Sequence, residues 1–512
     1  MSASLIFIAT LVSRISGFAR EIAMAAFFGT SVLTDAWLMA SALPNLLFST
    51  INGAISVTVV PLMTQGDAEY SSRSVMRFLN EVFTALFVLS AGLVLVLEIF
   101  TPSIIHAMAP GFHSPREIRL TILMTRIMIP TIFFWGVAGL AVGILQEREE
   151  FFLPALSPVA VNIARIATII ILGHLLFGIV GVAIGFTLAV ISQLAVTLPK
   201  LRQMGIRLHF RWHFSHPLMK RMLKISGPFF LTSSVGSVGI IVDRVLASGL
   251  VTGSIAALNY SYVLVQIPIG LVISSLATPI YTRLSQHHSA RQGDTFRQLA
   301  MQGFRLVLLI IVPVTVWFLA LRIPILRLLY QHGAFNGQST DLTSGTLLFF
   351  AMGLPGFSLA FYLQRLFFAT QDTRSPARFS IITIMINIAG DLVLVHFMQA
   401  DGLALATGGA SWINAALLTW KALNPRYNAH LRIRRTLFSL ALAGGVMSVI
   451  TLLLYHVMHM ATVSGIIPLL ATLTLTVAIS GLVYLLVLLA LRFPDLETMR
   501  LRLVGGRRRA TR

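Results

Sequence analysis

Three charged residues occur in an otherwise apolar stretch near the start of the chain. Arg14, Arg20 and Glu21 lie in SRISGFAREIAMAAFFG, residues 13–29, within a run predicted to form a membrane helix. A charged side chain at the centre of a bilayer costs about 2.5 to 3.5 kcal/mol, so each of these groups must face protein or water. Guanidinium groups bind phosphate and carboxylate oxygens in a bidentate manner. The chemistry that this stretch favours is therefore anion recognition.

The same three charges allow a structural interpretation and a functional one. Arg14 and Glu21 project within about 20° of each other on a helix, so one sector of that helix is polar. In the structural interpretation, Glu21 pairs with Arg20 or Arg14 and neutralises it. In the functional interpretation, which we favour, the surplus positive charge lines a water-filled cavity that receives an anion.

Further charges occur inside other predicted helices. Asp35 follows Thr34 at the start of the second helix, where a threonine cap and an acidic first turn suit the helix dipole, so capping and a cavity role are both open. Asp243 and Arg244 are adjacent, about 100° apart, and reach one cavity only at its wall. Asp243 and Asp391 are candidates for ion coupling or for pairing with a base. Structural pairing is the expectation for Arg126, Arg165 and Asp391 as single charges.

A proline marks the second helix as a candidate gate. Pro44 lies in SALPNLLFSTINGA, where Asn45, Asn52 and Gly53 follow it. Proline removes a backbone hydrogen bond and bends a helix. We expect a broken or bendable element of the kind that gates transporters, with Pro44 and Gly53 as the gating positions. An ordinary proline kink is the alternative.

The elements that position these residues are membrane helices. Hydrophobic residues make up 56% of the 512 and charged residues only 11%, far from the composition of soluble domains. Cysteine is absent, which excludes disulfides and thiolate chemistry. Apolar runs predict an all-α polytopic membrane protein with about 14 transmembrane helices. They lie near residues 5–28, 35–63, 76–100, 119–145, 152–176, 178–200, 222–249, 254–281, 299–321, 342–368, 376–398, 402–422, 436–459 and 464–491.

The net charge of +20 is a topology signal rather than a sign of nucleic-acid binding. Most Lys and Arg residues fall in alternate loops, such as residues 200–224 and 421–435, and in the tail RLRLVGGRRRATR. The positive-inside rule therefore places both termini in the cytoplasm.

An internal repeat relates the two halves of the chain. GILQEREEFFLPALSPVAVNIAR aligns with FFATQDTRSPARFSIITIMINIAG, so that Asn162 and Asn387 are 225 residues apart. The offset spans an even number of helices, so the copies have the same orientation and form a parallel repeat. We predict a six-helix lobe over 1–205, a second six-helix lobe over 206–425, and two last helices with a basic cytoplasmic tail over 426–512. In such transporters the substrate site lies between the lobes near mid-membrane.

Enzyme signatures are weak. The chain has no P-loop, no His-Glu-x-x-His and no Gly-x-Ser-x-Gly motif. We therefore expect no enzyme activity, no cofactor and no metal site, although a membrane glycosyltransferase or ligase is a distant alternative.

Several motifs together resemble one family. SRISGFAREIAMAAFFGTSVLTDAWLMASALPNLL, VVPLM, APGF, LPALSPVAVNIA and QDTRSPAR are similar to the MurJ (MviN) lipid II flippases of the multidrug/oligosaccharidyl-lipid/polysaccharide exporter superfamily. The resemblance implies fourteen helices in two lobes, a central cationic cavity and a hydrophobic groove toward the last two helices. Arg14, Arg20 and Asp35 match functional positions of the family. Glu21 stands where an aspartate is usual, and Phe48, Ser49, Val263 and Gln266 replace charged residues that are common there.

The resemblance implies transport of a lipid II-type peptidoglycan precursor from the inner to the outer leaflet by alternating access. Substrate binding would involve Arg14, Arg20, Glu21, Asp35, Asn45 and Arg244, with Arg244 compensating for the base missing at Val263. A flippase for another lipid-linked glycan, or a small-solute exporter of the same fold, is the alternative. Implied partners are a lipid-linked anionic glycan and membrane lipids, without nucleic acid. We expect a monomer in the bacterial cytoplasmic membrane.

Overall fold

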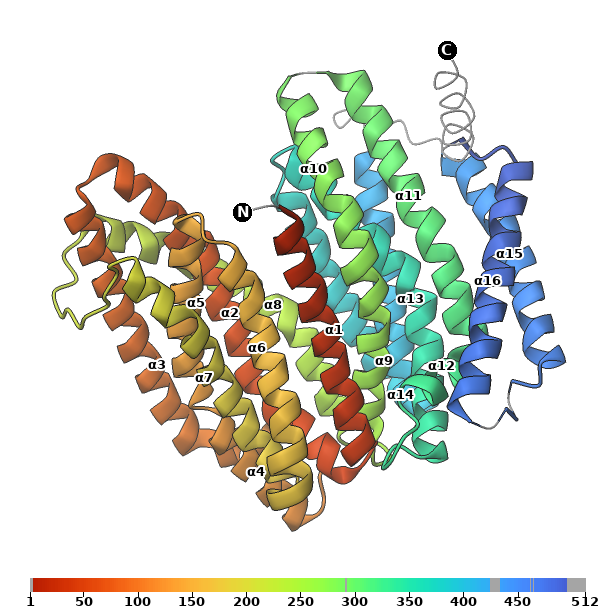
Figure 1. The fold of residues 1–512 in the computed structure, drawn as a ribbon, viewed down its shortest axis with the longest axis horizontal. Coiled ribbons are helices and arrows are strands. Elements are labelled where there is room, and N and C mark those ends of the chain that lie inside the picture. The colour runs from red at the N-terminus through yellow and green to blue at the C-terminus, as the bar shows by residue number, and fades with distance from the viewer. Residues whose placement is uncertain (1–2, 291, 424–432, 461, 464, 495–512) are drawn as a thin grey trace. The chain divides into compact units, whose positions relative to one another are not determined.

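The computed structural model describes the chain except for residues 1–2, 291, 424–432, 461, 464 and 495–512, and Figure 1 shows its fold. Every regular element in the described part is a helix, and no strand occurs among those residues. Eleven helical segments are long and apolar enough to cross a membrane. The all-α membrane architecture expected from composition is confirmed at this level.

The chain divides into two compact units. The first unit comprises residues 1–256 with 333–335, and the second comprises 257–332 with 336–512. The first unit contains α1 (Ala3–Phe28), α2 (Val32–Glu69), α3 (Ser72–Met108), α4 (Pro115–Met128), α5 (Thr131–Glu147), α6 (Phe152–Thr168), the π-helix η1 (Ile169–Phe177), α7 (Ile179–Gln203) and α8 (Pro217–Ala247).

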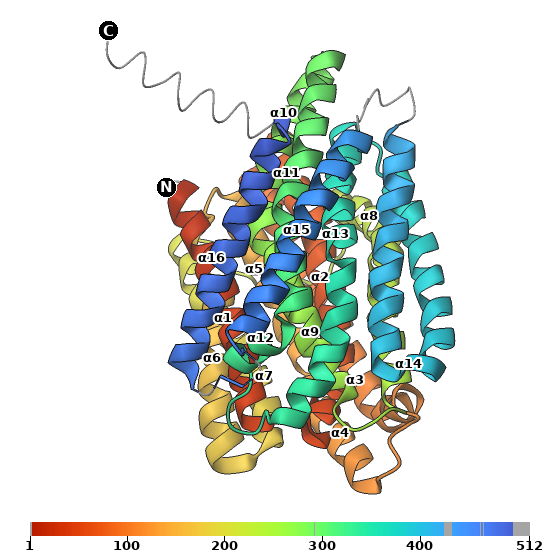
Figure 2. The ribbon, with the colours of Figure 1, turned by 90° about the vertical axis from the view of Figure 1, so that its right-hand side faces the viewer.

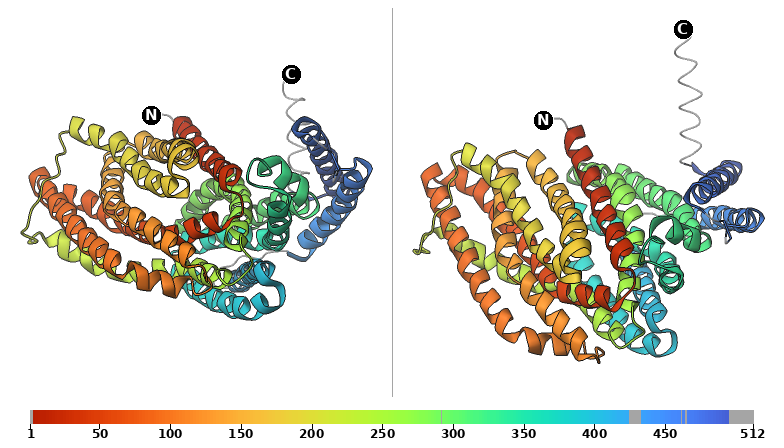
Figure 3. Two further views of the ribbon diagram at one scale, coloured as in Figure 1. Left: turned by 90° about the horizontal axis from the view of Figure 1, so that it is seen from below. Right: turned by 60° about the horizontal axis from the view of Figure 1, so that its bottom comes forward.

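The second unit starts within α9 (Ser254–Pro268). It continues through the π-helix η2 (Ile269–Ile273), α10 (Ser274–Ser289), α11 (Gly293–Ala320), α12 (Arg322–Leu329), α13 (Gly337–Ala369), α14 (Arg374–Ala422), α15 (Ile433–Val457) and α16 (Ile466–Ala490). Helices α15 and α16 pack side by side and form the blue pair in Figure 3.

Small residues allow close helix contacts in the first unit. On α5, Gly139 faces Asn52 of α2 and Gly143 faces Ile55, and an added Cβ at Gly139 would overlap the asparagine side chain. On α7, Gly185 faces Thr168 of α6 with no room for a Cβ. These glycines serve packing, because they let helix backbones approach closely where lipid provides no hydrophobic driving force between helices.

Helix α2 is not broken at its proline. It runs without interruption from Val32 to Glu69 with Pro44 and Pro61 inside it. Asn52 donates from its side-chain nitrogen to the carbonyl of Phe48 at 3.1 Å, four residues back. The expectation of a broken helix is wrong, because a single missing backbone bond can be tolerated within a helix packed on its neighbours. Bending at Pro44 and Gly53 stays a prediction.

Helix α14 consists of two arms that meet at Gln399, which has φ 52° and ψ −129°. The arms lie side by side (Figure 2), joined by a bond from the Asn387 amide to the Thr407 hydroxyl. The break between η1 and α7 has the same backbone form, since Gly178 has φ 60° and ψ −148°. Gly178 and Gln399 are 221 residues apart, the offset that relates Gly181 to Gly402 in the sequence repeat. The repeat therefore extends to backbone conformation.

Candidate functional site

An arginine network links α1 to α6 in the first unit. The Arg20 guanidinium donates to one Glu21 carboxylate oxygen from Nη2 at 2.6 Å and from Nε at 3.2 Å. Its Nη1 donates to the Asn162 side-chain oxygen at 3.1 Å. The Asn162 amide in turn donates to the Ser13 carbonyl and the Ser16 hydroxyl of α1. Arg20 is thus held on both sides, and Glu21 pairs with Arg20 rather than with Arg14.

Two more guanidinium groups lie near the same carboxylate. Arg165 of α6 is in electrostatic range of Arg20 and Glu21, and its guanidinium carbon lies 4.0 Å from the centre of the Phe186 ring. Arg244 of α8 is in range of Glu21 and of Asp243, and donates to the Leu38 carbonyl at 2.6 Å. One glutamate therefore faces three arginines, and among the described residues Asp243 adds a second negative charge beside Arg244. The cluster carries surplus positive charge.

The space beside this cluster is small. A cavity of about 10 Å³ is lined by Arg20, Glu21 and Arg165 and closed by Trp37 and Phe186. That volume holds about one water molecule. The cluster has the charge for an anion, but a diphosphate fits only when the surrounding helices move.

Arg14 and Asn45 lie apart from the network. The Arg14 side chain is exposed, and among the described residues it forms no ion pair. Asn45 is half-buried on α2. The charge at Arg14 is available to solvent or to a ligand, because no carboxylate neutralises it.

Asp35 caps a helix that is remote in sequence. Its carboxylate accepts hydrogen bonds from the backbone nitrogens of Gly253 at 2.6 Å and Ala256 at 2.8 Å, at the start of α9. The N-cap of α2 itself is Ser31, whose hydroxyl accepts from the Thr34 nitrogen. The expected threonine cap is wrong, because the Thr34 hydroxyl donates to the Gly29 carbonyl at 2.9 Å instead. Asp35 is buried and fixes the N-terminus of α9 through these two hydrogen bonds.

Asp391 lies in a polar cluster of the second unit. The residue is fully buried, and its carboxylate accepts from the Asn387 amide at 2.9 Å. The same amide donates to Thr407 at 3.4 Å. The described partner of Asp391 is thus an amide, and its role in ion coupling or pairing stays a prediction. Asp243 lies half-buried in the first unit.

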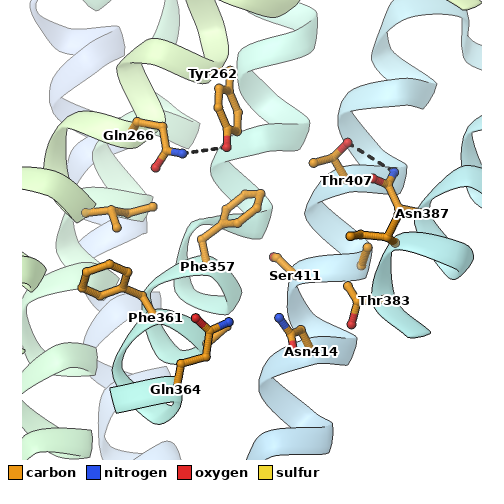
Figure 4. Close-up of a pocket in the computed structure, with 14 residues that line it drawn as sticks. Tyr262, Gln266, Phe357, Phe361, Gln364, Thr383, Asn387, Thr407, Ser411 and Asn414 are labelled. Carbon is orange, nitrogen blue, oxygen red and sulfur yellow. Dashed lines mark hydrogen bonds between the residues drawn. The ribbon is translucent and has the colours of Figure 1, made fainter. Parts of the chain in front are cut away.

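Beside this cluster the second unit has a larger cavity, of about 420 Å³, between α9, α13 and both arms of α14 (Figure 4). Its polar lining consists of hydroxyl and amide groups, including Gln266, Gln364, Asn387 and Asn414. Neither charge nor a sequence motif marks this cavity, so sequence reasoning missed it.

The comparisons with known proteins agree with this architecture. The family model described as lipid II flippase MurJ matches residues 24–473. The chain belongs to the MurJ family of lipid II flippases. Among its MurJ relatives, a probable lipid II flippase from Rhizobium tropici is 31% identical over 421 residues, which are 80% of this chain and 78% of the relative. One from Vibrio cholerae serotype O1 is 30% identical, with 95% of each chain covered.

Solved structures share this fold. A lipid II flippase MurJ in an inward closed conformation matches with a TM-score of 0.81 and 26% identity, over 94% of this chain and 98% of the other. An inward-facing multidrug resistance transporter of the MATE family matches with a TM-score of 0.61 and 15% identity, over 84% and 96%. The second likeness concerns the fold alone.

Residue types and spacing alone do not assign Asn162 and Arg165 to the first-unit cluster of this MurJ chain. Asn162 is marked only as a repeat position, and Arg165 only as a single charge for which structural pairing is predicted. Arg126 does form such a pair, with Glu98 at 3.8 Å, whereas the Arg165 guanidinium lies over Phe186. The usable signal was spacing, because Asn162 and Arg165 are three residues apart and share a helix face.

Proposed function

We propose that this protein moves lipid II, a polyprenyl-diphosphate-linked peptidoglycan precursor, from the inner to the outer leaflet by alternating access. The observation that carries the proposal is the MurJ family match over residues 24–473, joined to a structural likeness along 94% of the chain. The positive cluster of the first unit supplies the chemistry that such a substrate requires. Its diphosphate is anionic and cannot cross hydrocarbon unaided.

The arginines are the proposed diphosphate ligands. Arg20 is pre-oriented by Glu21 and Asn162, so little side-chain entropy remains to be lost on binding. Arg14 carries an unneutralised charge, and Arg244 adds a third guanidinium, in line with the compensation proposed for Val263. Glu21 orients the Arg20 guanidinium, and Asp35 holds the N-terminus of α9. Asn45 is assigned to the substrate-facing part of α2.

Substrate movement requires the small cavity to widen. We assign this to bending of α2 at Pro44 and Gly53, because proline leaves the helix one backbone bond short at that point. A membrane potential negative inside favours outward transfer of an anion by about 2.3 kcal/mol per charge per 100 mV. No nucleotide hydrolysis or bond-forming step is needed, and Asp243 and Asp391 are the candidates for coupling to a cation.

The proposed topology has fourteen spans with both termini in the cytoplasm of a bacterium. The eleven candidate spans count α14 once and do not include α1 or α8. Counting its two arms separately and adding α1 and α8 supports fourteen. The proposed lobes are 1–205 and 206–425, followed by 426–512, in a protein that acts as a monomer among membrane lipids.

The test is rescue of a bacterial strain depleted of its own lipid II flippase. We expect growth and normal cell shape with this protein, and no rescue by Arg14→Ala or Arg20→Ala when both variants are present in the membrane at wild-type amounts. Arg126→Ala is the matched control, since Arg126 pairs with Glu98 away from the cluster. Full rescue by both Arg14→Ala and Arg20→Ala would refute the proposed diphosphate site. If the wild-type protein did not rescue growth, lipid II would be refuted as its substrate.

A further inference from the structure

The cavity of the second unit has the size of a ligand site and an uncharged lining. Its volume of about 420 Å³ falls within the range of about 300 to 1,000 Å³ typical of small-molecule pockets. Of the fourteen side chains that line it, eight are polar and none is Asp, Glu, Lys, Arg or His. An ionic group would have no counter-charge on these walls. The lining suits a neutral polar ligand.

Amide groups of this cavity have unused hydrogen-bonding capacity. The Asn414 side-chain oxygen is buried and has no hydrogen-bond partner in the described part of the chain. Gln364 likewise forms no hydrogen bond to any described residue. Figure 4 shows the two amides facing the same space from α13 and from the second arm of α14. The buried Asn414 oxygen calls for a ligand or water, since an unmet buried polar group costs about 1 to 3 kcal/mol. The Gln364 amide is half-buried and open to a ligand or to water.

The remaining polar groups mostly offer acceptors. Thr383 and Thr407 donate their hydroxyl hydrogens to backbone carbonyls four residues back, at 2.7 and 3.0 Å. The Asn387 nitrogen is occupied by Asp391 and Thr407, which leaves its oxygen to accept. A ligand therefore needs several donors for these oxygens, with an acceptor for the Gln364 and Asn414 nitrogens.

Aromatic rings form another part of the wall. Phe357 and Phe361 line the cavity from α13, and Figure 4 shows both rings beside the amides. The C–H face of a pyranose packs against such rings, while its hydroxyl and acetamido groups supply the donors and the acceptor. A hydrocarbon chain would leave the amides unpaired, and a small cation would find no carboxylate among the residues that line the cavity.

A second cavity, of about 320 Å³, shares Phe361 and Gln364 with the first. It also holds Arg365, whose guanidinium carbon lies 4.5 Å from the centre of the Phe361 ring. An acidic substituent that extended from a sugar into this second cavity would meet the arginine. The two cavities together match a neutral sugar that carries an acidic branch.

We propose that the cavity between α9, α13 and α14 binds an acetamido sugar of the lipid-linked headgroup, with Gln364 and Asn414 as its hydrogen-bonding residues. This assignment rests on the proposed function, because it takes the headgroup from that substrate. It adds a site that recognises the sugar, separate from the arginines that would bind the diphosphate.

The test compares three lipids bound to the purified full chain in nanodiscs: lipid II, a polyprenyl diphosphate bearing one N-acetyl sugar and no peptide, and the bare polyprenyl diphosphate. The variants are Asn414→Leu with Gln364→Met, singly and together. Gln302→Met on α11 is the control, because Gln302 is exposed and lines neither cavity. We expect the double variant to lose about tenfold in affinity for both sugar-bearing lipids and nothing for the bare lipid.

Thermal unfolding separates recognition from folding. Asn414→Leu removes a buried oxygen without a partner, so its unfolding midpoint should equal or exceed that of the wild type. A lower midpoint with equal losses for all three lipids would show a structural role and overturn the proposal. Unchanged affinities of the double variant for all three lipids would also overturn the proposal. A loss of affinity for lipid II alone would overturn it as well, because the cavity would then bind the peptide rather than the sugar. If the wild type binds none of the three lipids, the proposed function fails instead.

Discussion

The pairing of Arg20 with Glu21 allows the structural and functional interpretations to be separated by a double-mutant cycle. Arg20→Ala leaves the Glu21 carboxylate, only 8% exposed, without the guanidinium that contacts it at 2.6 Å. Removing one partner of a buried ion pair costs about 3 to 5 kcal/mol. The Arg20 side chain is 24% exposed, so solvent screens the pair and we expect about 2 to 3 kcal/mol.

The other two variants should be milder. Glu21→Ala leaves an arginine that keeps its bond to Asn162 and partial access to water, so a loss of about 1 kcal/mol is expected. The double variant removes both charges and should lose less than the sum of the single variants, with a coupling of about 1 to 2 kcal/mol. Thermal unfolding of the purified proteins would report this order as midpoints.

Transport then distinguishes the roles. If Arg20 binds the diphosphate, Arg20→Ala and the double variant both fail to move lipid II in vesicles, although the double variant is the more stable. Glu21→Ala keeps the base and retains part of the rate. Normal transport by the double variant would refute the reasoning, because Arg20 would then serve only to neutralise Glu21.

Three further outcomes are expected. Asp35→Ala should lower the free energy of unfolding by about 2 to 3 kcal/mol, because two backbone donors at the start of α9 lose their buried acceptor. Asp35→Asn should cost less, since its amide oxygen can still accept one of these bonds. Equal unfolding midpoints for all three proteins would contradict this capping role. Burial lowers the pKa of His216 from 6.5; Glu81 opposes this shift and Arg77 adds to it. The neutral imidazole is therefore favoured in the folded state, so the contribution of His216 to stability is fully present above pH 6.5 and is lost as the pH falls below it. His216→Gln should remove that part of the pH dependence of unfolding. Gln399→Gly should raise the midpoint by relieving about 1 kcal/mol of backbone strain, while Gly178→Ala, at the equivalent turn, should lower it.

The repeat shows how similar helices acquired opposite charge. Asn162 and Asn387 occupy equivalent positions in the two copies. At the same offset, Arg165 of the first copy corresponds to Gly390, and Ile166 corresponds to Asp391 of the second copy. In the first unit the asparagine supports an arginine, and in the second it donates to a carboxylate. One scaffold thus presents a cationic cluster in one copy and a polar, acid-backed cluster in the other.

The helices themselves were predictable from the sequence, because a bilayer requires about twenty apolar residues for each span and proline, glycine and charge mark where spans end. The repeat, and the presence of the costly charges Arg20 and Glu21 inside a span, also followed from residue types and spacing alone. An intramembrane charge is costly enough to be recognised without coordinates.

The partners of those charges were decided by tertiary structure. From sequence spacing alone, Glu21 could pair with either Arg14 or Arg20. In the structure it pairs with Arg20, which also donates a hydrogen bond to Asn162 of α6. The capping of α9 by Asp35 joins residues more than 200 positions apart, and the amide-lined cavity takes its walls from three separate helices. Periodicity within one helix indicates which face is polar, but only packing determines what that face meets.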